Sequence, residues 1–241
     1  MNYAIVLAGG SGLRAGGLLP KQFQPLKGSP VVIWSIRTFH KFDPECRIVV
    51  VVHRDYMDLW YREIQPVCDR EGIMVEIAEG GNSRIHSVRN GLLKIREMIG
   101  KHTDSPSANP IVFIHDGARP FLTTRMIDEG VKYVAEGIGA IPVLPVTDSL
   151  RIKRGEETDA VDRSLYLAVQ TPQIFRYEDI YRAYLNAGDE GGLTDDASVA
   201  EQSGIKIATY SGAPINIKIT NPIDFAIGDA LASTLEASTI E

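Results

Sequence analysis

The chain has 241 residues, 44% of them hydrophobic and 23% charged, a composition typical of a globular protein large enough for one well-buried α/β domain. Its formal net charge of −6 argues against bulk attraction to nucleic acid or to an anionic membrane. No apolar run approaches the roughly 20 residues that span a bilayer, and no secretory signal opens the chain, so we expect a cytoplasmic protein with a single domain over residues 1–241.

The first predicted element is an apolar strand over residues 3–7 that leads directly into a glycine-rich turn. Small residues and then two cations follow the strand: Gly9, Gly10, Ser11, Gly12, Arg14 and Lys21. Because glycine has no Cβ, backbone N–H groups can close around an anion there, and the cations can neutralise its charge. This combination predicts a polyphosphate site, and hence an enzyme that handles nucleotides.

The turn matches neither of two common phosphate-binding loops. A Walker A loop would end in Gly-Lys-Ser/Thr, whereas Gly12 is followed by Leu13 and Arg14. A dinucleotide fingerprint also fits poorly. Ala15 is a tolerated residue at the position of the third glycine, but no acidic residue closes the second strand, which ends before His53. An ordinary strand-to-helix turn with surface cations stays open as the simpler alternative.

Strand-like runs then alternate with helical patterns. Strands are predicted over 48–52, 74–78 and 111–115, and helices from Ser29-Pro30, over 83–98 and over 123–136. This alternation predicts a mostly parallel sheet covered by helices on both faces, with ligands beyond the carboxyl ends of the strands. The glycine turn, Gly80-Gly81 and Asp116 each follow a strand, so we expect them to meet at one rim.

Two stretches interrupt the alternation. Residues 103–110 are polar and predict a surface loop. Residues 148–173 predict a projecting β-arm, with a strand over 149–153, a charged loop over 154–159 and a returning strand over 165–169. An isolated hairpin is only marginally stable, so such an arm needs a partner surface.

The turn and a series of later segments together resemble the cytidylyltransferases that act on 2-C-methyl-D-erythritol 4-phosphate, and also their sister family, the ribitol-5-phosphate (pentitol phosphate) cytidylyltransferases. The later segments are Gly-Gly-Asn-Ser-Arg-Ile-His-Ser-Val at 80–88, His-Asp-Gly-Ala-Arg-Pro at 115–120, Pro-Val-Thr-Asp-Ser-Leu at 145–150, Val-Asp-Arg at 161–163, Gln-Thr-Pro-Gln at 170–173, Thr-Asp-Asp-Ala-Ser at 194–198 and Asn-Ile-Lys-Ile-Thr at 216–220. The chain departs from the family at Ala15, at Asn82 and in its Ala8-Gly9-Gly10 opening, and none of these changes removes a charge.

The resemblance implies a three-layer, Rossmann-like nucleotidyltransferase fold and the transfer of CMP from CTP to a polyol phosphate. The acceptor phosphate is its own anionic nucleophile, since a phosphate monoester has a second pKa of about 6, and no general base is required. Mg²⁺ is expected, bound chiefly by the triphosphate. The resemblance further implies a homodimer built through the 148–173 arm.

Site residues follow from the same resemblance. Arg14 and Lys21 correspond to transition-state stabilisers. Lys218 and Arg163 correspond to residues that position the acceptor, Arg163 reaching across from the neighbouring subunit, and Ser149 and Thr194 would add hydroxyl contacts. CTP would be bound by Ala8, Gly9, Gly10, Ser11, Gly12, Gly81, Asn82, Ser87 and Asp116.

Simpler interpretations stay open at several of these positions. Asp116 fits a helix cap or turn former, Ser87 a solvent-facing helix residue, Arg163 a partner of a nearby carboxylate, and Lys218 a residue that blunts a strand edge. His115, beside Asp116, is expected to be structural.

Alternative functions also remain at this stage. Val-Asp-Arg at 161–163 favours methylerythritol phosphate as acceptor, whereas the Leu-Ala-Gly-Gly opening favours ribitol 5-phosphate. A sugar-1-phosphate nucleotidyltransferase and a nucleotide-binding scaffold without turnover are more distant alternatives.

Overall fold

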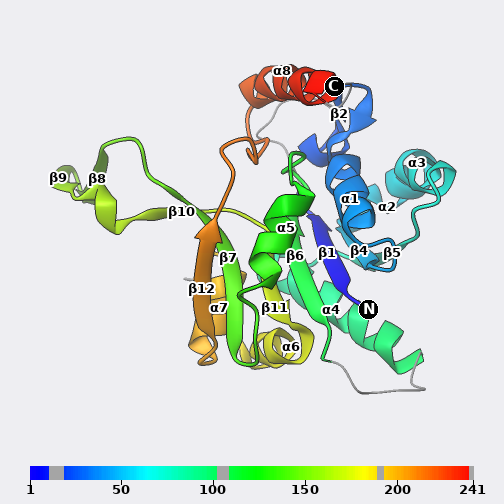
Figure 1. Ribbon diagram of the computed structural model, residues 1–241, viewed down its shortest axis with the longest axis horizontal. Coiled ribbons are helices and arrows are strands. Elements are labelled where there is room, and N and C mark those ends of the chain that lie inside the picture. Colours follow the sequence, from blue (N-terminus) through cyan, green and yellow to red (C-terminus); the bar gives the residue numbers. More distant parts are fainter. Residues whose placement is uncertain (11–18, 102–108, 189–192, 239–241) are drawn as a thin grey trace.

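Buried runs of β-branched residues build the middle of a large mixed sheet (Figure 1). The computed structural model describes residues 1–10, 19–101, 109–188 and 193–238, and within them eight strands form this sheet in the order β10-β7-β11-β6-β1-β4-β5, with β12 paired to β7. The strands are β1 (Tyr3–Ala8), β4 (Arg47–Val52), β5 (Val75–Glu79), β6 (Ile111–Asp116), β7 (Ile138–Pro145), β10 (Leu167–Val169), β11 (Gln173–Arg176) and β12 (Lys206–Ser211). The core strands β1, β4, β5 and β6 are parallel as predicted, while β10 and β11 run antiparallel to their neighbours.

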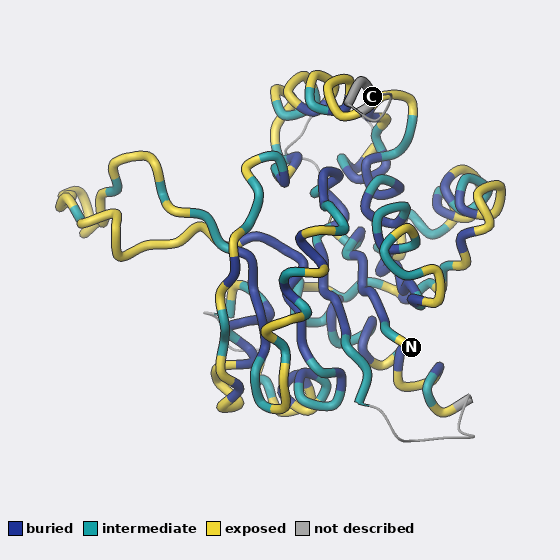
Figure 2. Tube along the Cα trace, in the orientation of Figure 1, coloured by how far each residue is buried: buried dark blue, intermediate teal, exposed yellow. Residues whose placement is uncertain are grey.

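Helices cover both faces of the sheet and make a three-layer fold. The described helices are α1 (Val31–Phe42), α2 (Met57–Leu59), a π-helical turn (Trp60–Ile64), α3 (Gln65–Arg70), α4 (Arg84–Lys101), α5 (Thr124–Val131), α6 (Tyr177–Asn186), α7 (Asp196–Gln202) and α8 (Pro222–Ser238). The last of them, α8, lies beyond the sheet and packs against Leu26 and Val31 (Figure 1). Side chains alternate along a strand, so Ala4 and Val6 pack in the cluster that contains Phe39 of α1. Tyr3 and Ile5 pack on the other face with Leu92 of α4. Figure 2 shows the buried strands between these layers.

Two predicted helices begin or end elsewhere. Ser29–Pro30 form a short strand, β3, paired with β2 (Pro25–Leu26), and α1 starts only at Val31 with Pro30 as its N-cap. Pro30 has an extended backbone, with ψ of 138°, and therefore stands outside the helix. The helix expected to end at residue 136 stops at Val131. Most of the predicted polar loop lies outside the described residues.

A β-hairpin stands away from the body of the molecule at the position predicted for the arm (Figures 1 and 2). It consists of β8 (Leu150–Arg154) and β9 (Glu157–Val161), joined through Gly155 at φ +64°. The predicted loop over 154–159 is therefore wrong, because a tight turn there lets β9 begin at Glu157. The returning strand, β10, pairs with β7 of the main sheet.

The register of the parallel strands brings their carboxyl ends level. Ala8 lies opposite Val52, Val52 opposite Glu79, and Leu7 opposite Asp116. The segments that leave β1, β4, β5 and β6 therefore emerge side by side, as expected for the ligand-binding rim of such a sheet. None of the described helices combines the length and the apolar character needed to cross a membrane.

Candidate active site

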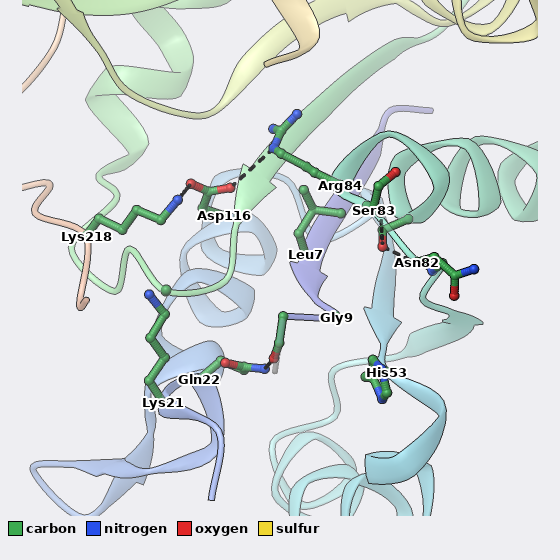
Figure 3. A pocket seen from close by; sticks show the side chains of 14 residues that line it. Leu7, Gly9, Lys21, Gln22, His53, Asn82, Ser83, Arg84, Asp116 and Lys218 are labelled. Carbon is green, nitrogen blue, oxygen red and sulfur yellow. Dashed lines mark hydrogen bonds and ion pairs between the residues drawn. The ribbon is translucent and has the colours of Figure 1, made fainter. Parts of the chain in front are cut away.

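A cavity of about 600 Å³ opens at this rim (Figure 3). It is lined by Leu7, Gly9, Gly10, Lys21, Gln22, His53, Gly81, Asn82, Ser83, Arg84, Ser87, Asp116, Ala118 and Lys218. Of the predicted site residues that the structure describes, the cavity unites Gly9, Gly10, Lys21, Gly81, Asn82, Ser87, Asp116 and Lys218. Ala8 is buried directly behind the lining. Ser11, Gly12 and Arg14 lie outside the described residues, so their roles stay predictions.

Gln22 ties the end of β1 to the segment that carries Lys21. Its side chain is buried, and its amide nitrogen donates to the carbonyl oxygens of Ala8 and Gly10, both at 2.8 Å. Gln22 belongs to the short 3₁₀ helix Lys21–Phe23, so this clamp fixes the distance between the glycine turn and Lys21. Its neighbour Phe23 is buried and packs near the ring of Tyr56, which anchors the 3₁₀ helix on the protein core.

A second glycine turn lies beside the first, so close that a Cβ on Gly80 would be 3.4 Å from the Cα of Gly9. Gly80 donates its N–H to the Val52 carbonyl at 2.7 Å, which extends the sheet by one bond. Gly81 must be glycine, because a Cβ there would lie 2.2 Å from the Cβ of His86. The buried Ser87 hydroxyl accepts from the Gly81 N–H at 3.1 Å and donates to the Ser83 carbonyl at 2.9 Å. The interpretation of Ser87 as a solvent-facing residue is therefore wrong.

Asp116 is the focus of the charges in the cavity. Its carboxylate lies 2.7 Å from Nζ of Lys218 and 3.9 Å from Nε of both Arg84 and Arg119. Figure 3 shows Lys218 and Arg84 pointing at it from opposite sides. Burial acts to raise the pKa of Asp116, but Lys218, Arg84 and Arg119 together bring it well below its ordinary value, so the group is ionised at neutral pH.

Backbone contacts deliver Lys218 to this carboxylate. Ile219 donates its N–H to the Ala118 carbonyl at 2.8 Å, and a guanidinium nitrogen of Arg119 donates to the Asn216 carbonyl at 2.8 Å. Lys218 lies in none of the described strands, so its interpretation as a strand-edge residue is wrong. The two ends of the sequence thus supply two cations, Lys21 and Lys218, to one cavity.

His115 supports Asp116 from behind without facing the cavity. The ring is fully buried, with Nδ1 3.0 Å from the Thr171 hydroxyl and Nε2 3.1 Å from the Arg119 carbonyl. The Thr171 hydroxyl also accepts the Asp116 N–H at 3.1 Å. Burial lowers the pKa of His115 to about 4, so the ring is neutral at pH 7. A neutral ring accepts from Thr171 through Nδ1 and donates to Arg119 through Nε2, which fits the expected structural role.

The remaining predicted residues do not line the cavity. Ser149 is exposed at the base of the arm and Arg163 beyond the hairpin, where Arg163 donates to the carbonyl of Thr147. The Asp162 carboxylate accepts the Ser164 N–H at 2.9 Å instead of pairing with Arg163. Thr194 is exposed just before α7.

Sequence reasoning overlooked four polar residues that line the cavity: Gln22, His53, Ser83 and Arg84. Ser83 and Arg84 stand inside the recognised segment at 80–88, and Gln22 directly follows Lys21, so their positions beside assigned residues were the available signals. His53 is the residue immediately after β4. Topology alone would have placed it at the rim.

One carboxylate in the cavity could contact a metal ion that arrives with a nucleotide. Among the described residues, no group of three or more His, Cys, Asp or Glu side chains could hold an ion. Asp116 is the single carboxylate among the described residues that line the cavity. Mg²⁺ keeps several waters and commonly takes one or two carboxylates plus substrate phosphates, and one carboxylate here matches that demand.

Comparisons with known proteins agree with this geometry. The sequence pattern of the 2-C-methyl-D-erythritol 4-phosphate cytidylyltransferase family matches residues 2–234. The enzyme of that name from Bacteroides thetaiotaomicron is 38% identical over 231 residues, covering 94% of this chain and 97% of the relative. The one from Cereibacter sphaeroides is 39% identical over 229 residues, covering 95% of each.

Solved structures give the same picture. A crystal structure of 4-diphosphocytidyl-2C-methyl-D-erythritol synthase superposes with a TM-score of 0.76 at 26% identity, covering 96% of this chain and 98% of the other. The 2-C-methyl-D-erythritol 4-phosphate cytidylyltransferase of Thermus thermophilus superposes with a TM-score of 0.69 at 26% identity, covering 97% of this chain and 100% of the other. The three-layer nucleotidyltransferase fold predicted from the sequence is thereby confirmed.

Proposed function

Because this chain belongs to the 2-C-methyl-D-erythritol 4-phosphate cytidylyltransferase family, we propose that it transfers CMP from CTP to 2-C-methyl-D-erythritol 4-phosphate and releases pyrophosphate. The product is 4-diphosphocytidyl-2-C-methylerythritol, an intermediate of isoprenoid precursor synthesis by the non-mevalonate route. The observation that carries the proposal is the cavity at the sheet rim, where two glycine turns face Lys21 and Lys218. The relatives support this acceptor over ribitol 5-phosphate.

Transfer of CMP to a phosphate requires fixed positive charges, and it requires no general base. An oxygen of the acceptor phosphate attacks the α-phosphorus of CTP, a new P–O bond forms, and the bond from that phosphorus to the β-phosphate oxygen breaks. The leaving group is pyrophosphate, and the nucleophile is already anionic. Fixed cations stabilise the charge that builds up at the pentacoordinate centre.

We assign the cations by their place in the cavity and in the family pattern. Lys21 lies beside the glycine turn and is proposed to stabilise the triphosphate and the transition state. Lys218, held 2.7 Å from Asp116 in the free enzyme, is proposed to bring the acceptor phosphate to the α-phosphorus. Arg14 is proposed as the second stabilising cation on the strength of the sequence alone.

The second glycine turn offers a basis for choosing cytosine. The Ser87 hydroxyl gives its proton to Ser83, so its remaining lone pair is an acceptor. An acceptor suits the amino group of cytosine and rejects the carbonyl oxygen that uracil carries in its place. A methyl group on Gly9 would lie 3.3 Å from this hydroxyl, so glycine keeps the approach open. Asn82 lines the same side and is proposed to contact the nucleoside.

Mg²⁺ belongs to the proposal as the ion that accompanies CTP. Asp116 is the residue that would hold it, together with the phosphates. When bound, the ion neutralises triphosphate charge. CTP is highly charged and does not cross a bilayer unaided, so the proposal places the enzyme in the cytoplasm, where this substrate is available.

The arm is proposed to pair two copies of the chain. Its apolar side chains are open to solvent, with exposed fractions of 79% for Leu165, 51% for Leu167 and 42% for Ile152. A lone hairpin with such a surface needs a partner, and a second copy supplies one. In that dimer the exposed Arg163 and Ser149 would reach the partner's acceptor site, and Thr194 would complete the same site from its own subunit.

The test is an acceptor-specificity assay on the purified chain. Pyrophosphate release is followed with CTP and Mg²⁺, and with either 2-C-methyl-D-erythritol 4-phosphate or ribitol 5-phosphate as acceptor. We expect turnover with the first acceptor and little with the second. Release with ribitol 5-phosphate alone would reassign the acceptor, and release with a sugar 1-phosphate and UTP would reject the proposal.

A further inference from the structure

A largely buried ion pair joins the wall of the cavity at Arg84 to the start of α7, and none of the roles proposed above uses it. The guanidinium of Arg84 is forked onto Asp196, with Nη1 2.8 Å from Oδ1 and Nη2 2.6 Å from Oδ2. The Tyr184 hydroxyl donates to the same Oδ1 at 2.5 Å. Asp196 is completely buried, and the Arg84 side chain is 29% exposed, on its cavity side.

The partners of Arg84 belong to different parts of the fold. Arg84 is the first residue of α4 and directly follows the turn at 80–83, which forms the nucleotide side of the cavity. Asp196 is the first residue of α7, two positions after Thr194. We call residues 80–83 the nucleotide turn and residues 194–197 the acceptor segment. Arg84 and Asp196 are 112 positions apart in sequence, so their ion pair is a tertiary connection between these two segments.

A second anchor fixes the same acceptor segment. Asp195 caps α7 by accepting the Ser198 N–H at 3.0 Å, and its other carboxylate oxygen accepts from the Gln173 side chain at 2.8 Å. Gln173 in turn accepts the Ala197 N–H at 2.7 Å. The segment around Thr194 is therefore held from the sheet side by Gln173 and from the cavity side by Arg84.

The geometry of Arg84 also determines how it acts on Asp116. Both Nη atoms of Arg84 bind Asp196, so the Nε atom is the one that faces Asp116, at 3.9 Å. Lys218 remains the close partner of Asp116, at 2.7 Å. Without Asp196 the guanidinium would be free to turn its fork onto Asp116 and compete with Lys218 for that carboxylate.

We propose that Arg84, locked by Asp196 and Tyr184, is a positioning residue that sets the acceptor segment at Thr194 and the Asp116–Lys218 pair relative to the bound nucleotide. The inference rests on the proposed function, because it assigns the acceptor to that side of the cavity. Reacting groups that are misplaced by about 1 Å can lose roughly 100-fold in rate, so the connection matters to the reaction as well as to the fold.

Three substitutions test the connection. Arg84→Lys keeps the charge and loses the fork, Asp196→Asn keeps the shape and loses the charge, and Tyr184→Phe removes a single hydroxyl. Arg96→Lys is the matched control, since Arg96 lies on the same helix and pairs at 2.6 Å with Glu178 on the molecular surface.

Steady-state pyrophosphate release is measured with each substrate varied in turn, and CTP affinity is measured by calorimetry. We expect Arg84→Lys and Asp196→Asn to lower kcat/KM for the acceptor by ~10- to 100-fold, with a much smaller change in CTP affinity. Tyr184→Phe should give a smaller loss of the same kind, and it keeps the test open if the other two variants fail to fold. Arg96→Lys should match wild type.

Equal losses for CTP and acceptor, or wild-type kinetics in folded Arg84→Lys, Asp196→Asn and Tyr184→Phe, would overturn the assignment. Hydrogen exchange gives a readout that does not depend on the acceptor. Backbone amides at 194–197 should exchange faster in Arg84→Lys and Asp196→Asn than in Arg96→Lys, and unchanged exchange would also overturn it. Absence of turnover in the wild-type protein, in contrast, would count against the proposed function and leave the exchange result to decide on the connection.

Discussion

Stability of this protein should fall in mild acid because a histidine is buried in its neutral form. His115 is fully buried, and burial lowers its pKa from 6.5 to about 4. Between pH 6.5 and pH 4 the His115 side chain is protonated in the unfolded chain but stays neutral in the folded protein. The free energy of unfolding therefore decreases as pH falls from about 6.5 towards 4, and it levels off below pH 4. Linkage gives a loss of about 2 kcal/mol between pH 7.5 and pH 5, and about 3 kcal/mol at pH 4.

The assay is urea-induced unfolding at fixed protein concentration, at pH 7.5, 6 and 5, for wild type and His115→Gln. Glutamine can replace the ring as both acceptor from Thr171 and donor to the Arg119 carbonyl, but it cannot take up a proton. The variant starts less stable, yet its loss between pH 7.5 and 5 should be smaller than that of wild type by about 2 kcal/mol. His40→Gln, at a partly exposed position of α1, controls for the loss of a histidine as such. The same pH dependence in wild type and His115→Gln would refute the reasoning.

Three further outcomes are expected. Lys21→Ala should lower kcat by about 10²- to 10³-fold while the protein stays folded, and unchanged turnover would remove Lys21 from the catalytic role. Gly117→Ala should destabilise the protein by ~1–3 kcal/mol in urea unfolding, because its Cβ would lie 2.8 Å from the Leu7 carbonyl oxygen, whereas Gly100→Ala, which has open space, should be neutral or stabilising. We expect the wild-type chain to sediment as the proposed dimer in analytical ultracentrifugation and Leu165→Asp, on the exposed arm, as a monomer; a dimeric Leu165→Asp variant would place the interface elsewhere.

The central strands were predictable because local pattern and tertiary environment agree there. The strand predicted over 48–52 is observed as β4 (Arg47–Val52), and its valines are buried on both faces. A continuous apolar run of that kind is what a strand between two helical layers requires. The same topology placed Gly81 and Asp116 at one rim before any contact was known.

The parts that escaped prediction depend on partners far apart in the sequence. Arg84 was visible in the recognised segment, but nothing in its own neighbourhood indicates Asp196 as its partner. Gln22 likewise follows Lys21, and its buried contacts with the carbonyls of Ala8 and Gly10 exist only once the 3₁₀ helix Lys21–Phe23 lies against the end of β1. Local spacing rules describe helices and strands; they do not describe such side-chain contacts.

The cavity also explains how an acidic chain can bind two polyanions. The net charge is −6, yet Lys21, Arg84 and Lys218 line one cavity, and together with the nearby Arg119 they outnumber Asp116 and Asp196, the two carboxylates paired with them. The Coulomb energy between charges falls with distance and is screened by salt beyond about 8–10 Å, so these near groups dominate over charges on the far surface. Pairing of β1 with β6 brings together cations from both ends of the sequence, and the fold therefore creates a positive site that composition would not reveal.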